Sequence, residues 1–438
     1  MRIGSPSLGS IAVLACAVAA HAQTGDPIAS RPLGNANLQL LDLSVDALAA
    51  VGASTARDDT LEVLQGGGHD PRQRGFTLQQ VELSALGAVD PYLNAEVHLI
   101  YFLDTEGESQ FEVEEAFLQT MALPFGLHEH GFQIEAGTFF TEFGRHNPRH
   151  PHQWDWQDAP FVISRFFGED GIRGPGARLG WLLPLPWFAE LHLGAQNAEG
   201  ETQVSFLAND EVFEERPIGG RPFAEQRVRS AADFTYLVRL ANGVDLTDTI
   251  TAQLGGSALF GPNATGSSGR TRILGVDAVA KWVPLDASRG WPFVQLEVEA
   301  LHRTYEADDG CFEEFDPDCV AGFVPDETLR DHGFYAQVLY GFVLRWAAGV
   351  RYEYGSGSGS NVAFDEDAGA VVRTSRSDDP YRSPRHRISP LLVFYPSEYA
   401  RLRLQYNYDD ITFSRDHTQH SVWLGVEFLI GAHPAHQM

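Results

Sequence analysis

The segment Arg401-Leu-Arg-Leu-Gln-Tyr-Asn-Tyr408 alternates between polar and apolar side chains without interruption. Successive side chains of a β-strand point to opposite faces, so this segment predicts a strand with two chemically different faces. The apolar face carries Leu402, Leu404, Tyr406 and Tyr408. The polar face carries Arg401, Arg403, Gln405 and Asn407. Such a strand separates apolar surroundings on one side from polar surroundings on the other.

The same period-two alternation recurs along the whole chain. It is clear in Val294-Gln-Leu-Glu-Val-Glu-Ala300, in Ala95-Glu-Val-His-Leu99 and in Val350-Arg-Tyr-Glu-Tyr354. The pattern predicts sixteen strands, at 36–50, 75–88, 92–103, 111–122, 131–141, 173–183, 187–197, 231–241, 247–260, 270–283, 291–305, 332–341, 345–355, 385–395, 399–409 and 419–431. No obvious turn residue separates the two strands between 332 and 354, so totals of 14 and 18 stay open.

The connections between these strands alternate between short and long. Short connections are 89–91, 184–186, 242–243, 283–290 and 396–398, and long ones are 51–74, 142–172, 198–230, 306–331 and 356–384. Outer-membrane barrels combine short periplasmic turns with long outer loops, whereas a soluble β-sandwich has no reason to keep this alternation. Aromatic residues near strand ends, among them Trp282, Trp291 and Tyr352, fit the girdles of a membrane barrel. The sequence therefore predicts an all-β fold, a closed antiparallel transmembrane β-barrel over 36–438 in a bacterial outer membrane, with both termini periplasmic.

Composition agrees with a β-barrel and argues against a helical membrane protein and a nucleic-acid-binding protein. Hydrophobic residues make up 43% of the chain, and the mean hydropathy is −0.19, because a barrel combines an apolar exterior with a polar lumen and wet loops. After residue 22 there is no run of about 18 apolar residues, which excludes helical membrane spans. A formal net charge of −28 argues against nucleic acid as a partner.

The first residues predict an export signal. Arg2 is followed by an apolar stretch at 11–20 and by Ala20-His21-Ala22, which has small residues at the positions that a signal peptidase requires. We therefore expect a signal peptide over 1–22 and a periplasmic segment over 23–35. Lipidation at Cys16 is the alternative.

Two cysteines remain in the predicted mature chain, in Cys311-Phe-Glu-Glu-Phe-Asp-Pro-Asp-Cys319. An exported protein passes through an oxidising compartment, so we expect a local disulfide between Cys311 and Cys319. Two free thiols in a loop are the alternative.

The long connection at 142–172 is the main candidate for a pore constriction. Pro148, Pro151 and Pro160 stiffen it, and a constriction needs fixed charges on a rigid support. The candidate constriction residues carry both signs of charge and are Glu142, Arg145, Arg149, Asp155 and Asp158. A surface loop that caps the barrel is the alternative.

The same connection contains His146, His150 and His152, with Asp155 nearby. Three imidazoles within seven residues can bind one zinc ion if the loop curls. Solvated histidines in a wet loop are the alternative.

Alternation also predicts which strand residues face the lumen. We expect this set to include Glu82, Glu96, Glu135, Glu297, Glu299, Arg401 and Arg403. Glu82, Glu96 and Glu135, with Glu112 and Glu114, predict either an acidic patch or scattered solvated carboxylates. The sequence shows no Gly-x-Ser-x-Gly, no phosphate-binding glycine loop and no His-Glu-x-x-His, so we expect no catalytic residues and no enzyme activity.

Three stretches carry a resemblance to a known family: Glu114-Glu-Ala-Phe-Leu-Gln-Thr120, Gly137-Thr-Phe-Phe-Thr-Glu-Phe-Gly-Arg-His-Asn147 and Gly431-Ala-His-Pro-Ala-His436. They resemble bacterial porin-like proteins of the phosphate-selective-porin type, some of which are described as zinc-regulated TonB-dependent outer-membrane receptors. Such receptors carry a plug domain before a 22-stranded barrel. Too few residues precede the strands here for a plug, and there is no convincing TonB box, so we do not expect TonB as a partner.

Together these features predict a channel for diffusion of small solutes or ions through outer-membrane lipid. We expect no cofactor apart from the candidate zinc ion, and a homotrimer by analogy with other sixteen-stranded porins. The alternatives are a zinc-linked uptake protein without a plug, an outer-membrane enzyme, and a secreted glycan-binding β-protein.

Overall fold

The computed structural model describes residues 29–33, 36–312, 315 and 318–431. The predicted signal peptide over 1–22 and the alternative lipidation site at Cys16 lie outside the described residues.

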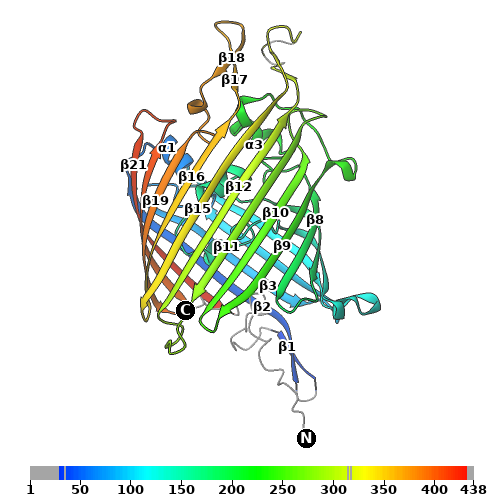
Figure 1. Cartoon of the computed structure of the whole chain (residues 1–438), viewed down its shortest axis with the longest axis vertical. Coiled ribbons are helices and arrows are strands. Elements are labelled where there is room, and N and C mark those ends of the chain that lie inside the picture. Colours follow the sequence, from blue (N-terminus) through cyan, green and yellow to red (C-terminus); the bar gives the residue numbers. More distant parts are fainter. Residues whose placement is uncertain (1–28, 34–35, 313–314, 316–317, 432–438) are drawn as a thin grey trace.

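Sixteen antiparallel strands close into one barrel, which confirms the predicted fold class (Figure 1). The barrel closes because β2 (Ala36–Ser54) pairs both with β3 (Gly75–Ala88) and with the last strand, β21 (Thr418–Gly431). The strands between them pair with their neighbours in chain order: β4 (Leu93–Leu103), β5 (Ser109–Thr120), β6 (Phe132–Phe140), β7 (Arg173–Leu182), β8 (Phe188–Asn197), β9 (Phe234–Thr247), β10 (Ile250–Pro262), β11 (Arg270–Trp282), β12 (Phe293–Ala307), β15 (Glu327–Val343), β16 (Trp346–Ser358), β19 (Arg385–Ser397) and β20 (Ala400–Ile411).

The two strands that sequence reasoning separates least clearly are β15 and β16. They are joined by a two-residue turn, and Arg345 in this turn has a left-handed backbone with φ of 72°. Because an arginine takes the position that glycine or asparagine usually fills, the sequence carries no turn signal here. The sixteen-strand count is nevertheless confirmed.

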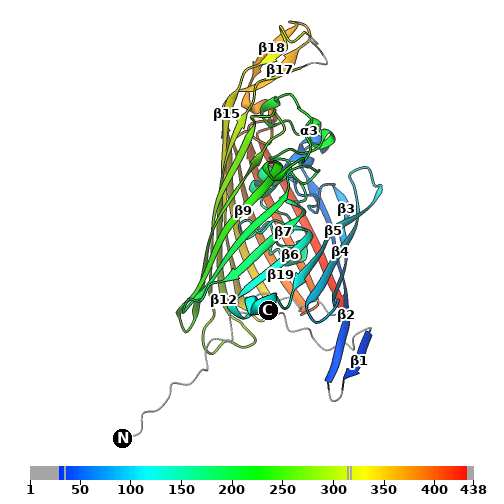
Figure 2. The ribbon, with the colours of Figure 1, turned by 90° about the vertical axis from the view of Figure 1, so that its right-hand side faces the viewer.

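Smaller elements lie in the connections. They are β1 (Ala29–Leu33), the hairpin β13 (Gly310–Cys311) with β14 (Phe323–Val324), the hairpin β17 (Asn361–Asp365) with β18 (Ala370–Thr374), the helices α1 (Asp58–Leu64), α2 (Phe161–Phe167) and α3 (Asp210–Glu215), and the 3-10 turns η2 (Pro124–His130), η3 (Pro151–Gln153), η4 (Ile218–Gly220), η5 (Ala231–Asp233) and η6 (Arg376–Asp378). Figure 2 shows β1 beyond one rim of the barrel and the β17–β18 hairpin beyond the other. No helix in the described part of the chain is long and apolar enough to cross a membrane.

The alternation in β20 sorts side chains between the exterior and the interior as predicted. Arg403 and Gln405 are buried inside the barrel, whereas 48% of Leu404 is exposed on the outside. The exterior of the neighbouring β21 is apolar as well, with Leu424 and Phe428 exposed. A continuous apolar exterior on a closed barrel is the surface that a lipid bilayer requires.

An apolar core fills part of the barrel interior. Phe143 and all of α2 are buried, and they pack against inward side chains of β9, β10, β11, β12 and β15. Trp291 belongs to a second interior cluster with Trp156 and is only 4% exposed. The expectation that Trp291 belongs to the membrane girdle is therefore wrong, because its ring fills space beside Phe293 and Tyr395.

Cys311 and Cys319 lie in the connection between β12 and β15. The structure joins them as a disulfide, and their Cα atoms are 5.8 Å apart. This pairing agrees with the local bridge expected from the export signal.

The outward position of Leu404 can be tested by substitution. We expect Leu404→Arg to lower the free energy of unfolding by about 2–4 kcal/mol, because it places a charge in the hydrocarbon region. Urea titration of the barrel folded into lipid vesicles measures the effect. Leu404→Phe is the control and should leave stability nearly unchanged. An arginine variant as stable as the phenylalanine variant would mean that this face contacts water.

Candidate functional site in the barrel lumen

The connection between β6 and β7 folds into the barrel, and we call residues 141–172 the lumen segment. The backbone N–H of Gly144 donates to Ser257 Oγ of β10 at 3.1 Å. The indole N–H of Trp156 donates to the carbonyl of Ser389 in β19 at 2.9 Å. His150 Nε2 lies 2.9 Å from a carboxylate oxygen of Glu115 in β5. Because these strands belong to separate parts of the wall, the segment crosses the lumen rather than capping it.

Arg145 and Arg149 of the lumen segment both bind Glu297 of β12. The distances are 2.7 Å from Arg145 Nε and 3.2 Å from Arg149 Nη1 to the same carboxylate oxygen. Glu299, two residues further along the strand, accepts the backbone N–H of Arg145 at 3.2 Å. A side chain at Gly144 would collide with the Glu299 carboxylate, so only glycine fits where the segment meets β12.

Asp158 is the second anchor of the lumen segment. Its carboxylate pairs with Arg351 and, at 3.1 Å, with Arg387, and it accepts hydrogen bonds from Gln405 and Asn407 at 2.8 Å each. Burial by itself raises the pKa of Asp158, but the two guanidinium groups outweigh burial and hold the pKa at about 2. Asp158 is therefore a fixed anion that ties the segment to β16, β19 and β20.

The inward arginines of β20 hold the backbone of the segment. Arg401 Nη2 donates to the carbonyl of His152 at 3.0 Å, and Arg403 Nη1 donates to the carbonyl of Trp156 at 2.8 Å. Both arginines also pair with Glu427 of β21, at 2.6 and 2.7 Å. Glu427 thus balances one of the two positive charges at the wall.

The predicted constriction residues lie inside the barrel, but they do not form one ring of charge. Glu142 binds Arg178 of β7 at 2.8 Å, and Asp155 accepts a hydrogen bond from Gln295 at 3.2 Å. Glu135 faces the lumen as expected and pairs with Arg178 as well. Since each charge binds an opposite charge or a polar group on the nearest wall strand, the set is spread around the lumen. Its role in setting the pore width stays a prediction.

The three histidines of the segment do not converge on one point, because His146 lies apart from His150 and His152, and this corrects the predicted metal-ligand set. The ring of His146 packs against Trp154, with centroids 4.8 Å apart, and burial lowers the pKa of His146 to about 3. The rings of His150 and His152 stack on each other at 5.6 Å. Tight turns at 146–149 and 150–153 place the ring of His146 against Trp154 and those of His150 and His152 against the barrel wall.

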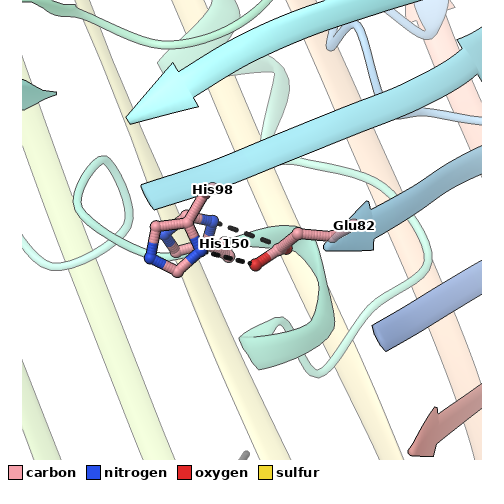
Figure 3. A group of neighbouring side chains, drawn as sticks. All are labelled: Glu82, His98 and His150. Carbon is pink, nitrogen blue, oxygen red and sulfur yellow. Dashed lines mark hydrogen bonds and ion pairs between the residues drawn. The ribbon is translucent and has the colours of Figure 1, made fainter. Parts of the chain in front are cut away.

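Instead, His150 and His152 join carboxylates and one histidine of the barrel wall, together with His69 of the connection between β2 and β3. We call this group the acid–histidine cluster, which consists of His69, Glu82, Glu96, His98, Glu114, Glu115, His150 and His152. Figure 3 shows His150 and His98 side by side, both facing Glu82. Glu82 and Glu114 are fully buried, and His98 and His150 are only 4% and 6% exposed.

A β-bulge in β5 brings two consecutive carboxylates into this cluster. Across the β4–β5 pair, His98 is opposite Glu115 and Leu99 is opposite Val113, so Glu114 is an extra residue. As a result Glu114 and Glu115 are both buried inside the barrel. Regular alternation would have turned one of them to lipid, which is why sequence reasoning included Glu114 and missed Glu115.

His98 and His69 were also missed. For His98 a signal was present, because the alternation of Ala95-Glu-Val-His-Leu99 puts His98 on the same face as the predicted lumen residue Glu96. His69 lies in the first long connection, where no periodicity indicates direction.

Comparison by sequence finds one relative and no family. No family model matches the chain. A relative from Aquifex aeolicus (strain VF5), described only as an uncharacterised protein, is 29% identical over 390 residues, which cover 84% of this chain and 72% of the relative.

Among solved structures, the outer membrane channel DcaP of Acinetobacter baumannii has a TM-score of 0.52 at 11% identity. The aligned residues make up 89% of this chain and 96% of the DcaP chain. An anion-selective porin from Comamonas acidovorans has a TM-score of 0.49 at 10% identity, over 90% of this chain and 99% of its own. The likeness to DcaP shows a shared barrel fold. The resemblance to phosphate-selective porins and zinc-regulated receptors is not confirmed by these comparisons.

The anchor at Asp158 predicts a large effect on stability. We expect Asp158→Ala to lower the free energy of unfolding by about 3 kcal/mol, because Arg351 and Arg387 each lose a buried counter-ion. Asp155→Ala is the matched control in the same segment and should cost much less. Urea unfolding in detergent micelles gives both values. Equal losses in the two variants would contradict the anchoring role of Asp158.

Proposed function

We propose that the protein is an outer-membrane channel through which small solutes or ions diffuse, and that the lumen segment sets the width of the passage. One observation carries this proposal: the segment lies inside the barrel and is held by charged wall residues as well as by apolar packing. A segment needed only to fill the barrel could be held by apolar contacts alone. Fixed charges of both signs at a narrow point are the means by which pores select solutes.

The apolar exterior supports a location in lipid, and the closed barrel of sixteen strands supports the bacterial outer membrane. In the proposed orientation the short turns, including those between β15 and β16 and between β19 and β20, face the periplasm. The chain ends would then be periplasmic. A homotrimer belongs to the proposal by analogy with other sixteen-stranded porins. We assign no catalytic role to any residue.

A second candidate function is metal-linked uptake, and the acid–histidine cluster is the observation that favours it. Imidazole and carboxylate groups in one buried place suit a transition metal better than an organic solute. In that case the lumen would bind the ion that it admits.

Removal of the centre of the lumen segment tests the channel proposal. We expect deletion of 147–158 to raise single-channel conductance substantially in planar bilayers, because it removes the part that crosses the lumen. Deletion of 361–374, the β17–β18 hairpin that projects beyond the barrel rim, is the control and should leave conductance unchanged (Figure 2). Heat-modifiable gel migration verifies that each variant is folded. Unchanged conductance in a folded 147–158 deletion would show that the segment does not limit the passage.

Ion preference is a separate prediction. We expect the open pore to favour cations, because the chain carries a net charge of −28 and fixed charge raises the local concentration of counter-ions. Arg401 and Arg403 oppose this preference, but Glu427 pairs with both and balances one of their two charges. The reversal potential in a potassium chloride gradient at low salt measures the preference, which screening over about 8 Å weakens at physiological ionic strength. A reversal potential of the opposite sign would reject it.

A further inference from the structure

We propose that the acid–histidine cluster binds one divalent transition-metal ion of the zinc type, with Glu82, His98 and His150 as its protein ligands. One ligand atom from each of these three buried residues lies within 4.8 Å of the other two. Zinc binds imidazole nitrogens and carboxylate oxygens at about 2.0–2.2 Å, so side-chain shifts of about 1 Å would place one ion in contact with all three. This inference does not depend on the channel proposal.

The orientation of both rings supports a shared ion. His98 Nδ1 lies 2.8 Å from Oε1 of Glu82. His150 Nδ1 lies 3.6 Å from Oε2 of the same carboxylate. On the opposite side of each ring, His98 Nε2 lies 2.9 Å from Glu96, and His150 Nε2 lies 2.9 Å from Glu115. Histidine ligands of metals usually donate their second ring N–H to a carboxylate, which orients the ring and increases its basicity. Each histidine therefore presents one nitrogen to the common site and the other to an orienting carboxylate.

The buried carboxylate of Glu114 beside the three ligands gives further support. Both carboxylate oxygens of Glu114 are buried without a hydrogen bond, and so is His150 Nδ1. His150 Nδ1 and one Glu114 oxygen lie 2.8 Å apart as an ion pair, so a protonated His150 offsets part of this burial without a metal. Buried polar atoms that lack hydrogen bonds are costly, and a cation between them would satisfy them.

Further groups around the site could complete the coordination. His152 Nδ1 lies 3.2 Å from Glu82, and His69 Nε2 lies 3.7 Å from Glu114. A cavity of about 30 Å³ borders His69 and Glu114, which is room for a water molecule as an additional ligand. Two imidazoles with one carboxylate favour zinc and similar ions, whereas magnesium and calcium prefer oxygen ligands alone.

The ion would join the lumen segment to the barrel wall. Glu82 belongs to β3 and His98 to β4, whereas His150 comes from the lumen segment. Bound metal would thus add a further attachment to those at Glu297, at Asp158 and at the inward arginines of β20. The alternative is a cluster in which protons alone balance the carboxylates and histidines, and the experiment distinguishes the two.

Calorimetric titration of the chelator-treated barrel with zinc chloride, in detergent, tests the proposal. We expect one zinc ion per chain, and at least a tenfold loss of affinity in His98→Ala and in His150→Ala. His146→Ala is the matched control, because His146 is buried in the same segment but outside the cluster. Heat-modifiable gel migration verifies folding, and His98→Gln and Glu82→Gln provide variants closer in volume if an alanine variant fails to fold.

Cobalt gives a second readout, since a cobalt ion held by two imidazoles and a carboxylate in a four-coordinate site absorbs visible light strongly. The absorption should appear in the unaltered protein and in His146→Ala, and it should vanish in His98→Gln. No zinc binding to the unaltered protein would overturn the proposal in favour of a proton-balanced cluster. Zinc affinity and cobalt absorption that survive replacement of both His98 and His150 would overturn it as well.

Discussion

The constraint behind this structure is that a closed barrel in lipid sends every second side chain inward. Backbone groups are paired between strands, so the strands cannot rotate to release a side chain from the lumen. In β20 the constraint directs Arg401, Arg403 and Gln405 into the interior. Charged groups enclosed in this way need partners, because an unpaired buried charge costs several kcal/mol. The lumen segment supplies many of these partners, and its path is therefore determined by the wall.

The charge arrangement explains why the segment can be both rigid and polar. Asp158 meets two arginines, and Glu297 meets two others, so carboxylates and guanidinium groups share partners in networks. A group with two partners loses less conformational freedom for each contact, and buried networks specify one arrangement when all members are satisfied. The apolar face of α2 contributes the remaining packing against β15 and its neighbours. Ion pairs and apolar contacts therefore both hold the segment in the lumen.

The strands could be predicted from the sequence because alternation and connection length are local properties. The interior contacts could not, because they depend on which strand lies across the lumen from which part of the segment. The bulge that turns both Glu114 and Glu115 inward leaves no mark in the sequence pattern. The separation of His146 from His150 follows from a loop path set by contacts with distant wall strands, among them those at Glu297 and Asp158. The residue types thus indicated which chemistry the lumen contains, but not which residues lie together in it.

The contacts that hold the lumen segment differ in how they respond to pH and to metal ions. Arginine keeps its positive charge at all physiological pH values and does not bind metal cations, so the contacts at Glu297 and Asp158 are permanent. Histidine can bind a proton or a metal ion, and its interaction with carboxylates changes accordingly. At His150 and His152 the segment meets carboxylates of the wall through such groups. Metal binding at the cluster would therefore act on the segment through its contacts with β3, β4 and β5, whereas the arginine contacts at Glu297 and Asp158 on the other strands bind no metal.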